Sequence, residues 1–149
     1  MRLRVVALVT SVALWGTSLA PAAEDRGYVV VVAASNAATS MKRQELARLF
    51  LKKTSRWSDG HEVVPVDLSV GSRARAAFTR GVLSVEGMGQ ISAVQDFWLQ
   101  QVYSGRSTPP VVKPTDADVI AFVAATPGAI GYVGAAPTAG TVKVLTIQD

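Results

Sequence analysis

The chain has 149 residues, a formal net charge of +4, one histidine and no cysteine. Without cysteine it has neither disulfides nor thiol chemistry, and a single histidine removes most metal sites and histidine-based catalysis. That histidine, His61, adjoins Asp59-Gly60 in a predicted turn, where a solvated surface side chain is expected. The length suits one domain that buries a hydrophobic core, and no repeat or linker marks a second domain.

Residues 1–22 are predicted to be a secretory signal peptide. A basic start, Met1–Arg4, precedes the apolar run Val5–Leu19, which is followed by small residues and a proline. Cleavage is expected after Ala22, with Ala23 as the second choice, and the alternative is a segment retained as an N-terminal anchor. Cleavage removes two arginines and lowers the net charge from +4 to +2. The sequence therefore predicts a periplasmic or secreted domain over residues 23–149.

The first half of that domain alternates predicted strands and helices. Tyr28–Ala34 is an unbroken run of valine and alanine after one tyrosine, which is typical of a strand covered on both faces. Ser35-Asn36 ends it in a loop, and a helix is predicted over Arg43–Lys52. A turn at Ser58–Gly60 then leads into a short buried strand, Val63–Val66.

The second half continues the alternation. Helices are predicted from Ser72 to about Leu83 and over Ile91–Tyr103, where Ile91, Val94, Trp98 and Val102 form an inward stripe. An extended piece at Val111-Val112 precedes a third helix, Asp116–Ala125, which Thr115 caps. Strands are predicted at Ala129–Val133 and Val142–Thr146, the last at an edge of the sheet. Gly131, inside a predicted strand, indicates that something approaches the backbone closely there.

Buried strands that alternate with helices predict an α/β fold, a three-layer sandwich with a sheet between helices. Ligands of such sheets bind beyond the carboxyl ends of the strands, at helix N-termini. If the strands run parallel, the loop at Ser35-Asn36 and the turn at Gly71-Ser72 lie on the same rim of the sheet.

The turn at Gly71-Ser72 is the strongest candidate site. A strand that enters a helix through a Gly-Ser turn leaves several N–H groups unpaired, and the helix dipole adds positive potential there. Arg73 and Arg75 add full charges in the first helical turn, although cations at a helix N-terminus are unfavourable in themselves. These residues predict an anion site, and the alternative is that Ser72 only caps the helix while the arginines are solvated.

Three segments carry specific motifs: Leu49-Phe50-Leu51 with Lys53, Trp57 and Asp59-Gly60; Gly71-Ser72 followed by Phe78; and Pro127-Gly128-Ala129-Ile130-Gly131-Tyr132-Val133. In order and spacing they resemble the I-F-L-G-K…W-x-D-G, G-S…F and P-G-A-I-G-Y-V motifs of phosphate ABC transporter substrate-binding proteins. The resemblance covers nearly all of the chain after the signal peptide. It implies one lobe of a type II periplasmic binding protein, in which two α/β lobes close on a tetrahedral oxyanion.

The resemblance also implies ligand-binding residues, and the chain departs from the family there. It implies that Gly71 and Ser72 face the ligand, with Ser69, Arg73 and Arg75 as further candidates. The chain matches only the second lobe, so half of the usual phosphate cage is missing. The family's phosphate-binding arginine precedes the turn, where this chain has Asp67 and Leu68, so Arg73 or Arg75 would have to replace it from the helix side.

Two functions of different classes follow from this sequence. The first is a non-enzymatic binding protein for phosphate or a similar small oxyanion, linked to phosphate transport or sensing. The second is an interaction or accessory module of the cell envelope that keeps the fold without high-affinity binding. The expected partners are a second copy of the chain or an envelope protein covering the exposed cleft face, and an ABC permease.

Enzymatic function is the third and weakest interpretation. No catalytic residue, cofactor or metal site is predicted, because Asp67, Asp116 and Asp118 are explained as strand-end and capping residues. Nucleic-acid binding is not expected at a net charge of +2 without a basic stripe interleaved with aromatic residues.

Overall fold

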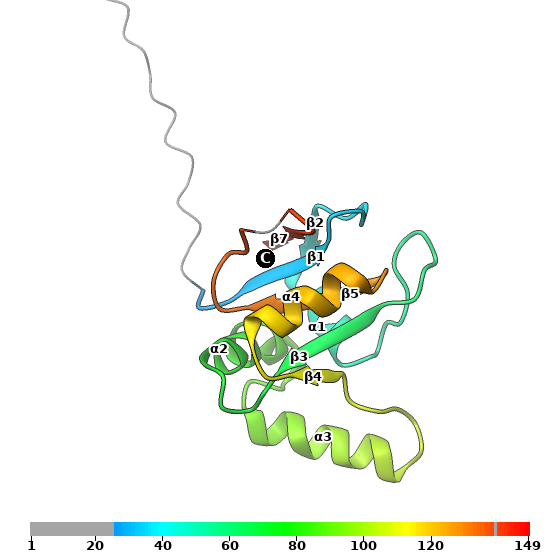
Figure 1. Cartoon of the computed structure of the whole chain (residues 1–149). Coiled ribbons are helices and arrows are strands. Elements are labelled where there is room, and N and C mark those ends of the chain that lie inside the picture. The colour runs from blue at the N-terminus through cyan, green and yellow to red at the C-terminus, as the bar shows by residue number, and fades with distance from the viewer. Residues whose placement is uncertain (1–25, 139) are drawn as a thin grey trace, which may run out of the picture.

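The computed structural model describes residues 26–138 and 140–149 (Figure 1). The predicted signal peptide and both predicted cleavage sites lie outside these residues. The strands are β1 (Val29–Ala33), β2 (Ser40–Lys42), β3 (Val64–Leu68), β4 (Val111–Lys113), β5 (Ala129–Val133), β6 (Val142–Val144) and β7 (Thr146–Gln148). The helices are α1 (Arg43–Phe50), α2 (Arg73–Gly81), the 3-10 helix η1 (Leu83–Glu86), α3 (Ile91–Tyr103) and α4 (Asp116–Ala125).

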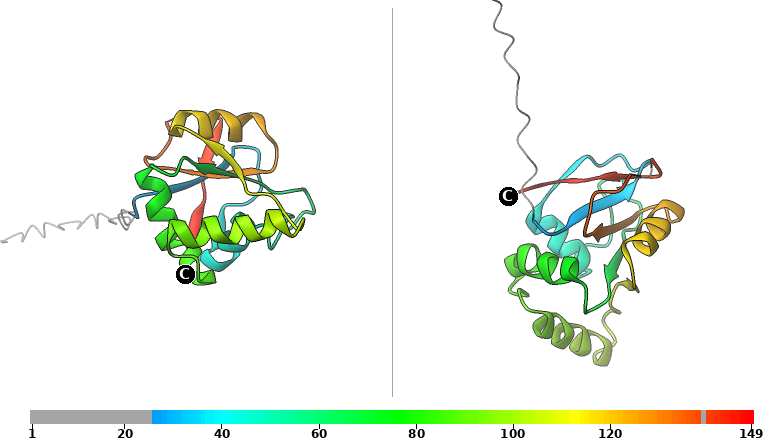
Figure 2. Two further views of the ribbon diagram at one scale, coloured as in Figure 1. Left: turned by 90° about the horizontal axis from the view of Figure 1, so that it is seen from below. Right: turned by 60° about the vertical axis from the view of Figure 1, so that its left-hand side comes forward.

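The described residues form the predicted three layers. The main sheet has the strand order β4-β3-β5-β1-β6. Helix α4 covers one face, whereas α1, α2 and α3 lie on the other, as the left view of Figure 2 shows. Valine-rich strands suit this position, because β-branched side chains pack well on a pleated surface that is covered on both sides.

The strands of the main sheet are not all parallel. β3 runs parallel to β4 and to β5, whereas β1 runs antiparallel to both of its neighbours, β5 and β6. The carboxyl end of β1 therefore lies at the same rim as the amino ends of β3 and β5. As a result, Ser35-Asn36 and Gly71-Ser72 lie at opposite ends of the sheet, which removes the shared rim that parallel strands would have produced.

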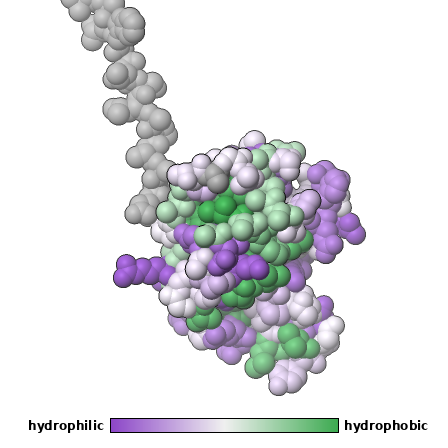
Figure 3. Space-filling view, in the orientation of Figure 1, coloured by the Kyte–Doolittle hydropathy of each residue, from purple (hydrophilic) through white to green (hydrophobic). Residues whose placement is uncertain are grey.

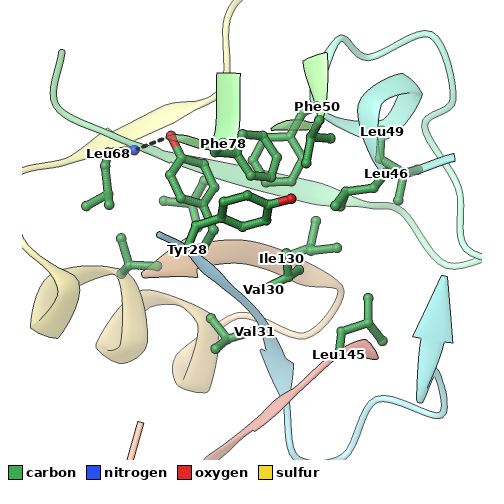
Figure 4. Packing of buried hydrophobic residues seen from close by; sticks show 14 of the residues in the cluster. Tyr28, Val30, Val31, Leu46, Leu49, Phe50, Leu68, Phe78, Ile130 and Leu145 are labelled. Atoms are coloured by element: carbon green, nitrogen blue, oxygen red, sulfur yellow. Dashed lines mark hydrogen bonds between the residues drawn. The ribbon is translucent and has the colours of Figure 1, made fainter. Parts of the chain in front are cut away.

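Aromatic rings fill the layer between the sheet and helices α1 and α2 (Figure 4). The Phe78 ring of α2 stacks on the Tyr132 ring of β5, with centroids 4.0 Å apart and planes 5° from parallel. Phe50 of α1 packs 4.6 Å from Phe78, and Tyr28 meets Phe78 edge-on at 5.4 Å. These contacts fix α2 against β5, and the N-terminus of α2 is the candidate site.

Gly131 has the role that its place in a strand indicates. A Cβ atom there would lie 2.6 Å from Cγ1 of Val66 and 2.8 Å from Cγ1 of Val119. The Val66 side chain of β3 and the packed side of α4 therefore approach the backbone at this point, and not a ligand. The absence of a side chain lets α4 lie close to the sheet.

Several elements differ from the sequence-based expectation. The final strand is divided: β6 pairs with β1 at the sheet edge, as predicted, but β7 pairs with β2 in a separate two-stranded parallel sheet that the sequence did not indicate. In α3, Val94 and Trp98 are buried as predicted, whereas Val102 is 51 % exposed. α3 lies at the lower end of the molecule, and Figure 3 shows a hydrophobic area over it. No helix among residues 26–138 and 140–149 is long and apolar enough to cross a membrane.

Candidate functional site

The candidate site is the turn Ser69–Ser72, which joins the carboxyl end of β3 to the first turn of α2. The Ser72 amide donates a hydrogen bond to the Ser69 carbonyl at 2.9 Å and closes the turn. Ser72 is the N-cap of α2: its Oγ accepts from the Arg75 amide at 3.3 Å. Its extended backbone, with φ −72° and ψ 132°, is usual for this position. The capping role predicted for Ser72 is therefore confirmed.

Amide donors remain at this helix end. Within the part of the chain that the structure describes, the amides of Gly71, Arg73 and Ala74 donate no hydrogen bond to another residue. Gly71 is exposed, and a Cβ atom built on it would meet nothing within 4 Å. The Ser72 amide, which the sequence also places among the free donors, is used inside the turn. Three amides of one helix end are thus without a hydrogen-bond acceptor among the described residues.

The side chains of the turn differ in what they can offer an anion. The Ser72 hydroxyl accepts from a backbone amide, and its own proton remains to donate. Arg73 is exposed on the first turn of α2. Ser69 is half-buried, and its hydroxyl donates to the Lys113 carbonyl at 3.4 Å, so its proton is directed at β4. The structure therefore brings Gly71, Ser72 and Arg73 together at the surface, with Ser69 turned away.

Arg75 points into the core, which corrects the expectation that it faces a ligand. The residue is only 7 % exposed. Its guanidinium donates to the Leu68 carbonyl at 2.5 Å and pairs with the Asp67 carboxylate at 3.1 Å. Because a buried cation needs a counter-charge, the carboxylate at the end of β3 determines where this arginine lies. Arg73 is left as the cation of the α2 N-terminus that faces outward.

Asp67 has a further partner in Tyr132, whose hydroxyl donates to the Asp67 carboxylate. The Leu68 amide bonds the same carboxylate at 3.0 Å, and it lies 3.5 Å from the Tyr132 hydroxyl, the contact drawn as a dashed line in Figure 4. Burial raises the pKa of Asp67 above its usual value, although Arg75, Tyr132 and the Leu68 amide act in the opposite direction. Burial, followed by the negative charge of Asp67, raises the pKa of the Tyr132 phenol.

Sequence reasoning treated Asp67 as a strand-end residue and did not connect it with Tyr132. The available signal was a carboxylate inside the apolar run Val63–Leu68, with an arginine eight positions later in the first turn of the predicted helix. A charge at a buried strand position requires a partner, so Arg75 was the natural candidate. Tyr132 lies 65 residues away, and its contact depends on the order of the strands.

A second helix N-terminus, that of α4, lies at the same rim and already has its own acceptors. Thr115 caps α4 by accepting from the Asp118 amide at 3.2 Å, and its hydroxyl donates to the Asp118 carboxylate at 2.6 Å. Asp116 accepts from the Gly134 amide at 2.9 Å. The first turn of α2, in contrast, contains no acidic residue. Its positive end is therefore the one that an external anion could neutralise.

The opposite rim has a different character. A pocket of about 450 Å³ lies there between the loop after β1 and the amino ends of β3 and β5. Its lining includes Asn36, Asp59, His61 and Glu62. His61 is exposed, with its Nδ1 3.1 Å from Asp59, which agrees with the solvated histidine expected from the sequence. No group of three metal-ligating side chains occurs within residues 26–138 and 140–149.

Comparison with known proteins identifies the fold. No protein-family model matches the chain, and no curated protein matches it in sequence. Among solved structures, it is similar to a phosphate ABC transporter substrate-binding protein from Clostridium perfringens with bound phosphate, at a TM-score of 0.62 and 15 % identity over 81 % of this chain and 44 % of that one. The chain has the fold of phosphate substrate-binding proteins.

Two further structures support this assignment. An ABC-type phosphate transport receptor from Vibrio cholerae aligns with a TM-score of 0.60 and 16 % identity, over 81 % of this chain and 46 % of that one. PstS from Borrelia burgdorferi aligns with a TM-score of 0.60 and 13 % identity, over 83 % and 47 %. The chain thus spans less than half the length of these relatives. This agrees with the single lobe that the sequence motifs imply.

Proposed function

We propose that this protein is an exported, non-enzymatic domain that binds phosphate or a similar small oxyanion at the N-terminus of α2, as part of phosphate transport or sensing. The observation that carries the proposal is the set of unpaired amides at Gly71, Arg73 and Ala74, in a helix end without its own acid. The shared fold with proteins named for phosphate transport supports the choice of ligand.

The proposed contacts need no catalytic group. The amides of the first turn of α2 donate to the anion, and the aligned peptide dipoles of the helix stabilise its negative charge. The Ser72 hydroxyl donates one more hydrogen bond, and Arg73 supplies a full charge with a planar pair of donors. We therefore assign the ligand contacts to Gly71, Ser72 and Arg73, with Ser69 as a support of the turn and without Arg75.

The proposed site is open, which limits its affinity. A single domain offers a solvent-exposed surface and not an enclosed cavity. Hydrogen bonds from the protein to the anion there only replace those that water already makes, so the net gain in free energy is small. The relatives are more than twice as long as the part that aligns with this chain. In our proposal, tight binding requires a second wall, supplied by another copy of this chain or by an envelope protein such as an ABC permease.

Export is part of the proposal because residues 1–22 have the composition of a signal peptide. We propose cleavage after Ala22, or after Ala23, and a periplasmic or secreted mature domain. Mass spectrometry of the protein purified from the cell envelope tests this directly, since the two cleavage sites and the uncleaved chain have different N-terminal masses.

The test of binding is a calorimetric titration with phosphate, sulfate and arsenate, run on the protein without residues 1–22. We expect Ser72→Ala and Arg73→Ala each to weaken phosphate binding at least about fivefold, because each removes one charged or charge-assisted donor. Thr115→Ala is the matched control for the first, since it removes the N-cap of α4. Arg80→Ala is the control for the second, since it removes an exposed arginine from the last turn of α2.

Equal losses in the variants and their controls would show that the anion binds elsewhere. No heat and no thermal shift at millimolar phosphate in the wild-type protein would favour the second function, an envelope interaction module that keeps the fold. The open rim beside α2 would then be its partner surface.

A further inference from the structure

Three polar side chains from three elements meet in the core directly beneath the Ser69–Ser72 turn. Asp67 comes from β3, Tyr132 from β5 and Arg75 from the first turn of α2. Asp67 and Arg75 are 8 % and 7 % exposed, and Tyr132 is fully buried. One oxygen of the Asp67 carboxylate pairs with the Arg75 guanidinium, and the other accepts a hydrogen bond from the Tyr132 hydroxyl. Strands β3 and β5 and the first turn of α2 are therefore joined at this carboxylate.

The network also holds the backbone of the turn. The Arg75 guanidinium donates to the Leu68 carbonyl at 2.5 Å, and the Leu68 amide bonds to the Asp67 carboxylate at 3.0 Å. The Arg75 amide donates to Ser72 Oγ, so one residue is tied to the turn by its backbone and to β3 by its side chain. The Tyr132 ring stacks on Phe78, which lies on α2 together with Arg75, and this contact fixes the ring.

Stability alone does not account for such a group. The desolvation of two charges offsets most of their attraction, and apolar side chains of the same volume often serve stability equally well. Arg75 is also unfavourable at a helix N-terminus unless a carboxylate compensates it. A buried ion pair with directional hydrogen bonds does restrict how the joined elements are oriented, because other arrangements leave charged groups unpaired.

We propose that Asp67, Arg75 and Tyr132 are positioning residues that hold the first turn of α2 at one orientation to β3 and thereby aim its free amides at the ligand. The role of these residues in orienting the turn is based on their contacts alone. The binding of an anion at the turn rests on the function proposed above. None of the three side chains touches the ligand. They act through the backbone of Leu68, Ser72 and Arg75.

Tyr132→Phe is the most direct test, because it removes one hydroxyl and leaves the stacked ring in place. Its matched control is Trp57→Phe, which removes the indole N–H that donates to the Gly128 carbonyl at 2.9 Å, at the opposite rim. Asp67→Asn is the second variant and leaves Arg75 without its counter-charge. Amide hydrogen exchange of each ligand-free protein is measured by NMR, and phosphate affinity is measured by calorimetry well below the melting temperature.

We expect Tyr132→Phe and Asp67→Asn to speed exchange of the Ser72, Arg75 and Ala76 amides by about tenfold relative to the Leu145 amide, which donates to the Val30 carbonyl away from both sites, and to weaken phosphate binding by about fivefold. Trp57→Phe is expected to change exchange near residues 57–64 and to leave the turn and the affinity as in the wild type. A lower melting temperature with unchanged relative exchange at the turn would overturn the proposal, because it would show a merely structural role.

The two readouts separate this inference from the proposed function. If the wild-type protein binds no phosphate, the proposed function fails, and the exchange of the ligand-free turn still decides whether the network positions it. If phosphate binds at the turn but the exchange and the affinity of Tyr132→Phe match those of Trp57→Phe, the positioning role is refuted and the binding function stands.

Discussion

At the scale of single residues, Gly131 and Gly71 differ in whether the structure has room for a side chain. Gly131 lies where any Cβ atom would overlap Val66 and Val119, so α4 depends on its small size. Gly71 lies in open space and has no close neighbour on its side-chain side. The sequence already separated the two, because Gly131 lies inside a predicted strand and Gly71 in a predicted turn.

We therefore expect Gly131→Ala to lower the free energy of unfolding by about 1–3 kcal/mol, since the added methyl group forces α4 away from the sheet. Gly71→Ala is the control and is expected to change stability by less than about 0.5 kcal/mol. Urea unfolding followed by circular dichroism measures both. Similar losses for the two variants would contradict the packing role of Gly131.

The buried carboxylate of Asp67 leads to a pH dependence. Because burial raises its pKa in the folded state above the usual value near 3.8, the folded protein binds this proton more readily than the unfolded chain does. The contribution of Asp67 to the free energy of unfolding is therefore largest below the unfolded pKa and falls as the pH rises through the folded pKa. The loss amounts to about 1.4 kcal/mol for each unit that separates the two values.

Asp67→Asn removes this titration. In urea unfolding between about pH 3 and pH 7, the stability of the wild-type protein relative to the variant should fall with rising pH. A difference that instead grows with pH would mean that the attraction of Arg75 and the hydrogen bonds of Tyr132 and Leu68 outweigh burial.

At the scale of elements, α3 buries only two of its 13 residues. Val94 and Trp98 are buried, and the Trp98 ring meets Phe97 edge-on at 4.9 Å. Leu99, Val102 and Tyr103 are 56 %, 51 % and 84 % exposed. Helix α3 is therefore held to the core by a short apolar stripe. The predicted stripe was longer because apolar residues recur at helical spacing beyond the part of α3 that contacts the core.

We expect Trp98→Ala to cost about 3 kcal/mol and to open α3 before the rest of the domain unfolds. Hydrogen exchange should show faster exchange of the α3 amides, whereas the amides of β3 and β5 keep their protection. Leu99→Ala, on the exposed side of the same helix, is the control and should leave exchange unchanged. A uniform loss of protection in all elements would instead show that α3 belongs to one cooperative unit with the sheet.

At the scale of the whole molecule, the affinity for an anion depends on whether solvent or a second protein surface covers the sheet rim at the N-terminus of α2. An open anion site of a few hydrogen bonds corresponds to a Kd on the order of 1 mM, or about −4 kcal/mol. At ten times that concentration, phosphate should stabilise the monomer by about 1.4 kcal/mol, which raises the melting temperature by about 5 °C.

Mass measurement in solution, with and without phosphate, shows whether a second wall is present. A monomer with weak binding fits the open site. A dimer that forms only with phosphate, together with a Kd far below 1 mM, would show that a second copy closes the site. Sulfate at equal concentration controls for effects of ionic strength.

Much of this molecule could be read from the sequence. The alternation of apolar strands and amphipathic helices predicted the three layers, and the Gly-Ser step before Arg73 predicted the capped helix with unpaired amides. Both are local properties: strand and helix patterns repeat over a few residues, and a helix leaves its first amides free wherever it begins. The sequence motifs also indicated the phosphate-binding-protein fold that the structural comparison shows.

The tertiary structure decided the features that depend on residues distant in the chain. The antiparallel direction of β1 moved Ser35-Asn36 to the far rim, and the pairing of β2 with β7 joined two ends of the domain. The inward orientation of Arg75 followed from a carboxylate on β3, which also accepts a hydrogen bond from a phenol on β5. Strand order and direction bring such groups together, and because a side chain chooses its partner among all groups that the fold places nearby, no local pattern contains that choice.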